Sequence, residues 1–252
     1  MRIRSLRLSL AVMAAATAAV TATTGVASAA PDFGSSGSSS GSSSGTSGGE
    51  MVITLVRHAE SAGNVSGLID TKVPGPDLTV RGRTQADNLV TNLADKKFDC
   101  AFASNMVRTE QTAAPTVAKR KLDLNVQPGF REIEAGQYEG TPEREAMSGY
   151  LQAPIKWLSG DLAARIPGSI DGNEFDARVD QALLAVQGRN CTSPVIFSHG
   201  GTIMFWSMMN AGNADPSKLG ADPMRNGGRV VLKGSPQKGW TIIEWVGHPD
   251  IG

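Results

Sequence analysis

The chain has few of the residues that build metal clusters. Its 252 residues include two cysteines and three histidines, with no CxxC pair and no His/Cys cluster. This scarcity excludes the common zinc-binding motifs. Cys100 and Cys191 both stand near the start of a predicted strand. A disulfide between them and two free buried thiols both fit the sequence.

An excess of one charge is also missing. The chain has 24 basic and 24 acidic residues. Residues 1–29 contain three Arg and no acid, so the rest of the chain has 21 basic against 24 acidic residues, a formal charge of −3. This balance, without a basic stripe, argues against nucleic acid and against an anionic membrane surface as partners. Internal repeats are absent as well, which excludes solenoids and propellers.

Residues 1–29 are predicted to be a secretory signal peptide. Three arginines open the chain, an apolar stretch follows over residues 8–26, and small residues at 27–29 provide a cleavage site. A retained membrane anchor is the alternative. With cleavage, we expect a protein that is secreted or associated with the cell wall and has no stable membrane insertion.

Residues 30–49 are predicted to be a flexible linker. From Gly34 to Gly49 every residue is Gly, Ser or Thr, and such a segment cannot bury apolar area. The folded domain therefore extends over residues 50–252, which is long enough for one substantial core.

Strand and helix patterns alternate through this domain. The predicted fold is an α/β class, three-layer α/β/α sandwich with a mainly parallel sheet, an antiparallel edge and a small helical cap insertion over residues 139–171. The predicted strands are residues 52–56, 99–103, 122–126, 194–197, 229–233 and 240–246. The predicted helices are residues 81–95, 105–118 with Asn105 as N-cap, 173–188 and 202–210.

Two of the three histidines follow apolar strands directly. Arg57-His58 ends the first strand and His199 ends the strand at 194–197. Arg108 comes just after the strand at 99–103. Because ligands bind at the carboxyl ends of parallel strands, we expect these four side chains to converge. Two histidines and two arginines at one sheet edge form a site for a phosphoryl group.

The chemistry of such a site assigns distinct tasks to these residues. Arg57 and Arg108 can each form paired hydrogen bonds with phosphoryl oxygens. A neutral His58 can attack phosphorus and form a phosphohistidine. We expect His199 to be protonated and to donate to the transferring group. A carboxylic acid is needed to protonate the leaving oxygen, and residues 131–140 offer the candidates.

Five segments in the same order resemble the histidine phosphatase superfamily, also called the phosphoglycerate mutase-like family. The resemblance extends from Met51 to the final hairpin. It depends on five groups of residues: Arg57-His58-x-Glu60-Ser61 with Asn64; Leu78-Thr79 with Gly82, Gln85 and Ala86; Ser104 with Arg108 and Gln111-Thr112-Ala113; Glu132 with Gly136, Glu139 and Gly140; and Ser198-His199-Gly200-Gly201.

The resemblance implies a role for each matching position. His58 is the nucleophile, Glu132 the proton donor, with Glu134 as the alternative, and His199 both a catalytic and a phosphate-binding residue. The substrate-binding residues are Arg57, Asn64, Arg108 and His199. No metal or other cofactor is implied. One departure is Ala59, where the family often has Gly.

The predicted activity is that of a phosphomonoester hydrolase acting on a small phosphorylated substrate or a phosphoprotein. A phosphotransferase or mutase of the same family is one alternative, and a non-catalytic domain that binds a phosphorylated ligand is another. The sequence does not define the substrate, because a fold can serve many functions.

Overall fold

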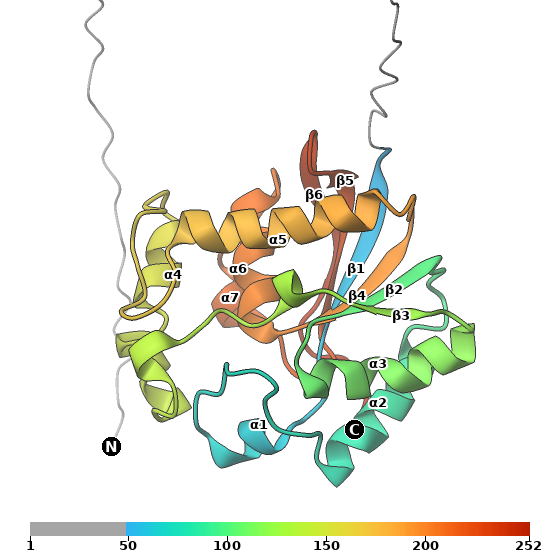
Figure 1. Cartoon of the computed structure of the whole chain (residues 1–252), viewed down its shortest axis with the longest axis horizontal. Coiled ribbons are helices and arrows are strands. Elements are labelled where there is room, and N and C mark those ends of the chain that lie inside the picture. The colour runs from blue at the N-terminus through green and yellow to red at the C-terminus, as the bar shows by residue number, and fades with distance from the viewer. Residues whose placement is uncertain (1–48) are drawn as a thin grey trace, which may run out of the picture. The chain divides into compact units, whose positions relative to one another are not determined.

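The computed structural model describes residues 49–252, so the predicted signal peptide and most of the predicted linker lie outside the described residues. Six strands form a single sheet (Figure 1). The strands are β1 (Met51–Arg57), β2 (Cys100–Ala103), β3 (Leu124–Val126), β4 (Pro194–Ser198), β5 (Arg229–Ser235) and β6 (Gly239–Val246).

The strand order across the sheet is β3-β2-β4-β1-β5-β6. Strands β3, β2, β4 and β1 are parallel to one another, whereas β5 is antiparallel to both β1 and β6. The predicted parallel sheet with an antiparallel edge is therefore confirmed. Strands β1 and β4 are adjacent at the centre, and their carboxyl ends meet at the same edge.

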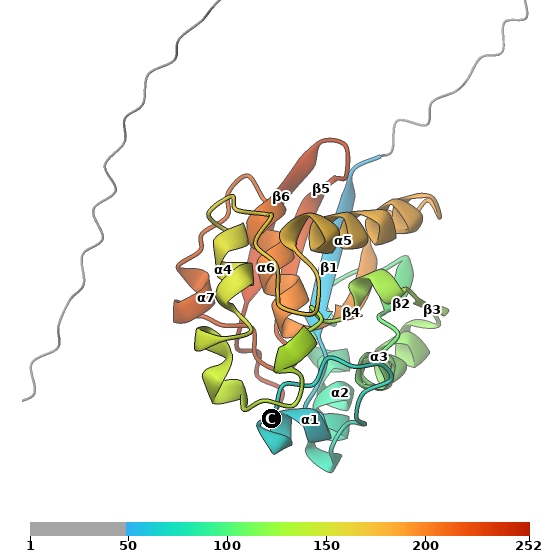
Figure 2. The same ribbon diagram turned by 60° about the vertical axis from the view of Figure 1, so that its left-hand side comes forward.

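Helices cover both faces of the sheet, as Figures 1 and 2 show. One face packs against α2 (Val80–Asn92) and α3 (Val107–Arg120) through a core that includes Val56, Leu89 and Phe197. The other face packs against α5 (Gly172–Gln187) and α6 (Gly200–Asn210). Strands buried on both sides explain why β1 and β4 are almost continuously apolar.

The predicted cap insertion lies between β3 and α5. Within residues 139–171 the helices are η3 (Glu143–Ser148), a 3₁₀ helix, and α4 (Gln152–Trp157). Two further 3₁₀ helices, η1 (Pro128–Phe130) and η2 (Gly136–Tyr138), precede the cap. The cap is anchored to the domain because the Trp157 ring stacks on Phe175 of α5 with ring centroids 5.3 Å apart.

Two local features differ from the sequence prediction. The predicted N-cap Asn105 is wrong: α3 begins at Val107 with Met106 at the N-cap, and the Ser104 hydroxyl accepts from the Met106 amide at 3.2 Å. A short helix, α1 (Ala62–Ser66), which is not among the predicted helices, follows β1, and Ser61 caps it. A second short helix, α7 (Lys218–Ala221), precedes β5.

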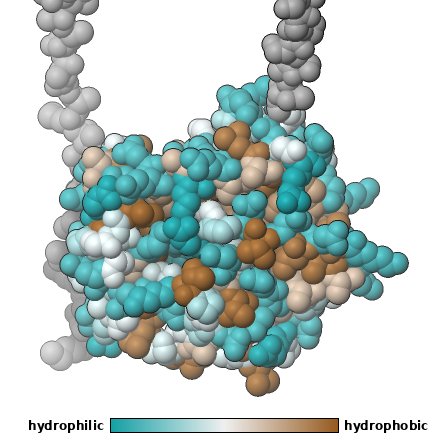
Figure 3. Space-filling view, viewed as in Figure 1, coloured by the Kyte–Doolittle hydropathy of each residue, from teal (hydrophilic) through white to brown (hydrophobic). Residues whose placement is uncertain are grey.

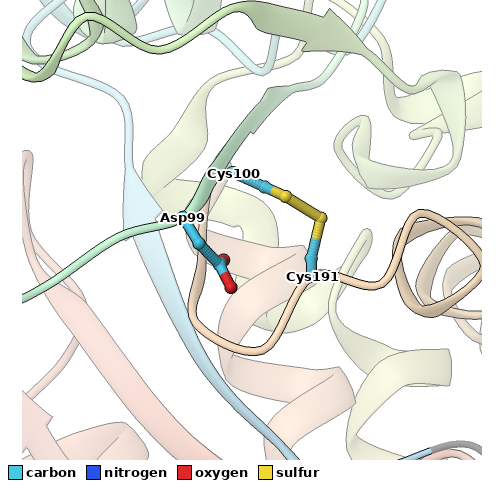
Figure 4. Close-up of side chains that lie close together, drawn as sticks. All are labelled: Asp99, Cys100 and Cys191. Carbon is cyan, nitrogen blue, oxygen red and sulfur yellow. A yellow bond between two sulfur atoms is a disulfide. The ribbon is translucent and has the colours of Figure 1, made fainter.

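Cys100 and Cys191 form a disulfide, which decides between the two alternatives that the sequence allowed. It joins the amino ends of β2 and β4, away from the carboxyl ends (Figure 4). Asp99 lies beside it, and its carboxylate accepts from the amides of Thr192 and Ser193. Asp99, Cys100 and Cys191 are the one group of close potential metal ligands within residues 49–252. The disulfide leaves neither cysteine as a thiolate that could bind a metal.

None of the helices between residues 49 and 252 combines the length and the apolar character needed to cross a membrane. On the face in Figure 3, hydrophobic residues form several small patches within a mainly hydrophilic surface.

Candidate active site

The carboxyl ends of β1 and β4 bring the two predicted histidines together. Arg57 is paired in register with Ser198 on the neighbouring strand. His58 and His199, one residue further along each strand, therefore lie side by side, with ring centroids 5.2 Å apart. Both imidazoles are almost completely buried.

Hydrogen bonds define the state of His58. Its Nδ1 lies 2.7 Å from the carbonyl oxygen of Ala59, so Nδ1 donates and Nε2 presents its lone pair to the site. Arg108 donates from Nε to that Nε2 at 3.1 Å. Burial, together with the charges of Arg108 and Arg57, holds the pKa of His58 well below its usual value. The imidazole is therefore neutral, as a nucleophile requires.

The residue at 59 departs from the glycine that is frequent in the family. The Ala59 methyl group packs in a small buried cluster with Leu78 and Ala86. Its amide donates to the Thr112 hydroxyl at 3.0 Å. The alanine is accommodated, and the loop after His58 keeps its carbonyl directed at Nδ1.

Arg108 stands in the first turn of α3 and is buried. Its Nη2 donates to the carbonyl oxygen of Asp70 at 3.0 Å, and its Nη1 lies 3.8 Å from Asp70 Oδ1. Nη1 has no hydrogen-bond partner within the described part of the chain. An unpartnered guanidinium nitrogen beside a nucleophile is suited to an anionic ligand.

Arg57 is the last residue of β1 and lines the same cavity as Arg108. Its Nη1 donates to the carbonyl oxygen of Met224 at 2.5 Å. Its Nε finds no hydrogen-bond partner among residues 49–252. Burial lowers the pKa of Arg57, and the nearby Glu132 carboxylate opposes that shift. Each of the two arginines therefore has one buried N–H group without an acceptor, and a phosphoryl oxygen can accept a hydrogen bond from it.

His199 stands at the N-cap of α6 and is fully buried. Its Nε2 lies 2.8 Å from the Ser104 hydroxyl, whereas its Nδ1 is buried with no partner in the described structure. The expectation of a protonated His199 is wrong for the free site. Burial, reinforced by the charge of Arg108, lowers its pKa well below the usual value.

Glu132 caps helix α6 from a distant part of the chain. Its Oε2 accepts from the Gly201 amide at 3.0 Å, and its Oε1 accepts from the Thr202 amide at 2.8 Å. These amides are among the unpaired donors of a helix N-terminus. A Cβ at position 201 would lie 2.8 Å from Oε1, so a larger residue there would displace the Glu132 carboxylate. Oε2 accepts one hydrogen bond here and retains a lone pair that can hold a proton.

The alternative acid, Glu134, has a different environment. It forms ion pairs with Arg131 and, at 3.6 Å, with Arg178. It does not line the cavity at the sheet edge, whereas Glu132 does. Arg178 is largely buried, and burial lowers its pKa to about 10. Glu134 therefore balances a buried cation and does not face the two histidines.

Asn64 lines the cavity, and its side-chain oxygen accepts from three donors, one of which is the Ser61 hydroxyl at 3.2 Å. The amide of Ser61 donates to this oxygen at 3.1 Å, and so does Asn226 Nδ2. Asn226 also donates to the carbonyl oxygen of His58 at 3.0 Å. Sequence reasoning did not identify Asn226, which stands in an irregular loop before β5 with no motif to indicate it.

The site opens into a cavity of about 390 Å³. His58, Arg57, Arg108 and Glu132 line its base, and residues of the cap and of the loop after α1 line its walls. His199 is not among the residues that line this cavity, and its ring lies against that of His58. The predicted site residues thus come together in one place. A buried neutral imidazole, two guanidinium groups and a carboxyl group define a phosphoryl-transfer site of the two-histidine type.

Comparison with known proteins agrees with this geometry. The sequence profile of the histidine phosphatase superfamily (branch 1) matches residues 53–247. The chain therefore belongs to the histidine phosphatase superfamily. The two histidines at adjacent strand ends are the structural counterpart of the motifs that the sequence carries.

Two similar sequences and one similar structure illustrate the relationship. PE-PGRS family protein PE_PGRS11 of Mycobacterium tuberculosis is 38% identical over 217 residues, which are 79% of this chain and 37% of that protein. Phosphoserine phosphatase 1 of Hydrogenobacter thermophilus is 32% identical over 148 residues, or 57% and 68% of the two chains. The α-ribazole phosphatase structure from Shigella flexneri has a TM-score of 0.59 and 26% identity, covering 80% of this chain and 98% of that one.

Proposed function

We propose that this protein is an exported, metal-independent phosphomonoesterase that works through a phosphohistidine at His58. The observation that carries the proposal is the state of His58: its Nδ1 donates to Ala59, and its Nε2 lone pair lies beside the guanidinium of Arg108. This arrangement provides a neutral nucleophile next to a cationic binding site for the phosphoryl group.

In the first step, Nε2 of His58 attacks phosphorus and the bond between phosphorus and the ester oxygen breaks. Arg57 and Arg108 neutralise the phosphoryl oxygens, and their buried N–H groups gain acceptors. Glu132 enters as the carboxylic acid and gives its proton to the leaving alcohol. The products of this step are the alcohol, a Glu132 carboxylate and phosphorylated His58.

In the second step, water replaces the alcohol and attacks phosphorus. Glu132 takes a proton from this water as the phosphorus–nitrogen bond breaks. The step releases inorganic phosphate and restores both His58 and the protonated Glu132. His199 donates from Nδ1 to the phosphoryl group once it has taken up a proton, because its other nitrogen is engaged by Ser104.

Export is the second part of the proposal, and the amino-terminal pattern of residues 1–29 supports it. A disulfide between Cys100 and Cys191 is typical of an oxidising compartment and is consistent with export. Mass spectrometry of the mature amino terminus from culture medium and cell-wall fractions tests this part. A protein that retains residues 1–29 would contradict it.

The enzymatic part is tested by phosphate release from an aryl phosphate in the presence of a chelator. We expect activity in the native protein and none in His58→Ala. Acid-quenched native protein should carry a phosphohistidine that the variant lacks. Equal activity in both proteins would overturn the assignment of the nucleophile. Return of the phosphoryl group to the alcohol product, without release of inorganic phosphate, would identify a mutase.

A further inference from the structure

The cavity above His58 changes character between its base and its walls. The charged groups that bind a phosphoryl group lie at the base. The side chains around them are mostly apolar and come from the loop after α1, the cap, α6 and α7. They are Leu68, Ile69, Ala146, Met147, Tyr150, Leu151, Ile155, Met204, Phe205 and Leu219.

Among the described residues that line the cavity, no cation is left to pair with a second anionic group of a substrate. The cavity's two cations, Arg57 and Arg108, both face the site of the phosphoryl group. Apart from Glu132, which enters the reaction protonated, the remaining acidic residues in the lining are Asp70 and Glu143. A second anionic group on a substrate would find no positive partner and would approach carboxylates, which costs free energy.

Three of the apolar wall residues extend the cavity surface into solvent. Leu68, Met147 and Ile155 are 43%, 62% and 37% exposed. They belong to the loop after α1, to η3 and to α4, so segments distant in sequence supply a common apolar rim. An apolar group that leaves the cavity at this rim still buries hydrophobic surface.

We propose that the physiological substrate is a phosphate monoester of an apolar alcohol without a second anionic group. The proposal rests on the phosphomonoesterase function proposed above. The alcohol occupies the apolar walls, and the single phosphoryl group is bound at the charged base. Esters that also carry a carboxylate or another phosphate are disfavoured by the acidic residues.

A series of straight-chain alkyl phosphates from ethyl to hexyl tests the apolar walls. The leaving alcohols have similar chemistry, so differences in kcat/KM report on the walls. Burial of each methylene contributes about 0.8 kcal/mol, which corresponds to at most about fourfold. We expect kcat/KM to rise about two- to fourfold per methylene.

A matched pair of substrates tests the charge preference. Butyl phosphate is compared with 4-phosphooxybutanoate, which ends the same chain with a carboxylate. We expect kcat/KM to be at least about tenfold lower for the carboxylate ester. Glu143→Gln should reduce this difference, because Glu143 is one of the carboxylates at the wall.

Leu68→Gln and Leu184→Gln form a matched pair of variants. Leu68 lines the cavity, whereas Leu184 lies on α5 outside the cavity lining, and the two are 43% and 46% exposed. We expect Leu68→Gln to flatten the dependence on chain length and Leu184→Gln to leave it unchanged.

The outcomes separate this inference from the function on which it rests. A flat series, or a preference for the carboxylate ester, with activity that still requires His58, would overturn the substrate class and leave the phosphomonoesterase in place. The absence of hydrolysis of every ester by the native protein would overturn both.

Discussion

Arg108 donates a hydrogen bond from Nε to Nε2 of His58 across 3.1 Å. The acceptor is the nitrogen that attacks phosphorus in the proposed mechanism. In the free protein, therefore, Arg108 engages the lone pair of the nucleophile and opposes its protonation. An incoming phosphoryl group replaces this contact, because its oxygens are better acceptors for a guanidinium.

Arg108→Lys tests this relationship. Lysine keeps the positive charge but loses the planar fork that contacts both His58 and the carbonyl oxygen of Asp70. We expect kcat/KM for an aryl phosphate to fall by a factor of about 10² to 10³. Arg81→Lys, at an exposed position on α2, is the control and should stay within about twofold of the native protein. A similar small effect at Arg108 would contradict the assignment.

The two buried histidines predict a pH dependence of stability. Their pKa values are well below the usual value in the folded protein. The unfolded chain takes up protons on them below about pH 6.5, while the folded protein does not. The free energy of unfolding should therefore decrease as pH falls below about 6.5, with a slope that approaches about 1.4 kcal/mol per pH unit for each histidine.

Urea unfolding between pH 6.5 and 5.5 measures this slope. His58→Asn removes one of the two groups, so its slope should be shallower than that of the native protein. The window lies above the range in which most carboxylates titrate. An unchanged slope in the variant would show that His58 does not contribute.

His199 predicts a proton uptake on anion binding. Its Nε2 is engaged by the Ser104 hydroxyl, and its buried Nδ1 has no partner in the described structure. In the tautomer whose Nε2 donates to Ser104, Nδ1 has no hydrogen until the ring takes up a proton. A dianion at the site requires a donor, so we expect His199 to take up a proton. Sulfate is a dianion throughout the pH range 6–8. Its competitive inhibition constant should therefore fall toward lower pH, by a factor that approaches about ten per unit.

His199→Gln provides the comparison, because glutamine does not titrate in this range. Its inhibition constant for sulfate should depend less on pH than that of the native protein. Equal pH dependence in the two proteins would assign the proton uptake to another group.

Glu132 and Glu134 are two residues apart in the chain, and we expect their replacement by glutamine to cause different defects. Glu132→Gln should lower kcat for alkyl esters by a factor of about 10² to 10⁴, because the leaving alcohol needs a proton. In the first step, measured as the single-turnover rate of His58 phosphorylation, the loss should be much smaller for nitrophenyl phosphate, whose leaving group needs no proton. An equal loss of this rate for both substrates would indicate a structural role for Glu132.

Glu134→Gln removes the carboxylate that faces the buried Arg178. We expect kcat to change by less than about threefold and the free energy of unfolding to fall by about 1–3 kcal/mol, as for other partly buried ion pairs that lose one partner. Thermal and urea unfolding provide the measurement. A large loss of kcat with normal stability would restore Glu134 as the acid.

Removal of the disulfide should lower the stability of the protein without loss of activity. Cys100 and Cys191 are separated by 91 positions, and they join the amino ends of β2 and β4, opposite the active site. Their replacement by serine should lower the free energy of unfolding by about 2–4 kcal/mol. The kcat/KM of the folded variant at 25 °C should stay close to the native value. A marked loss would mean that the disulfide positions the strand ends.

The sequence identified much of the fold because its patterns are local. Apolar runs at 52–56 and 194–197 are long enough for strands buried on both faces, and the residues that follow them are polar and charged. The helices over 81–95 and 173–188 were recognisable from their apolar spacing. The predicted N-cap Asn105 was wrong because α3 begins at Val107, and the Asn105 side-chain oxygen has no hydrogen-bond partner in the described part of the chain.

What the sequence alone determined is the set of chemical groups and their placement at strand ends: His58, His199, Arg57 and Arg108. Only the tertiary structure decided which protons and partners these groups have. The neutral state of His199, the contact of Glu132 with α6, the bond from Asn226 to His58 and the apolar cavity walls all join segments far apart in the chain. Such contacts depend on burial and distance in three dimensions, and no local pattern of residues encodes either.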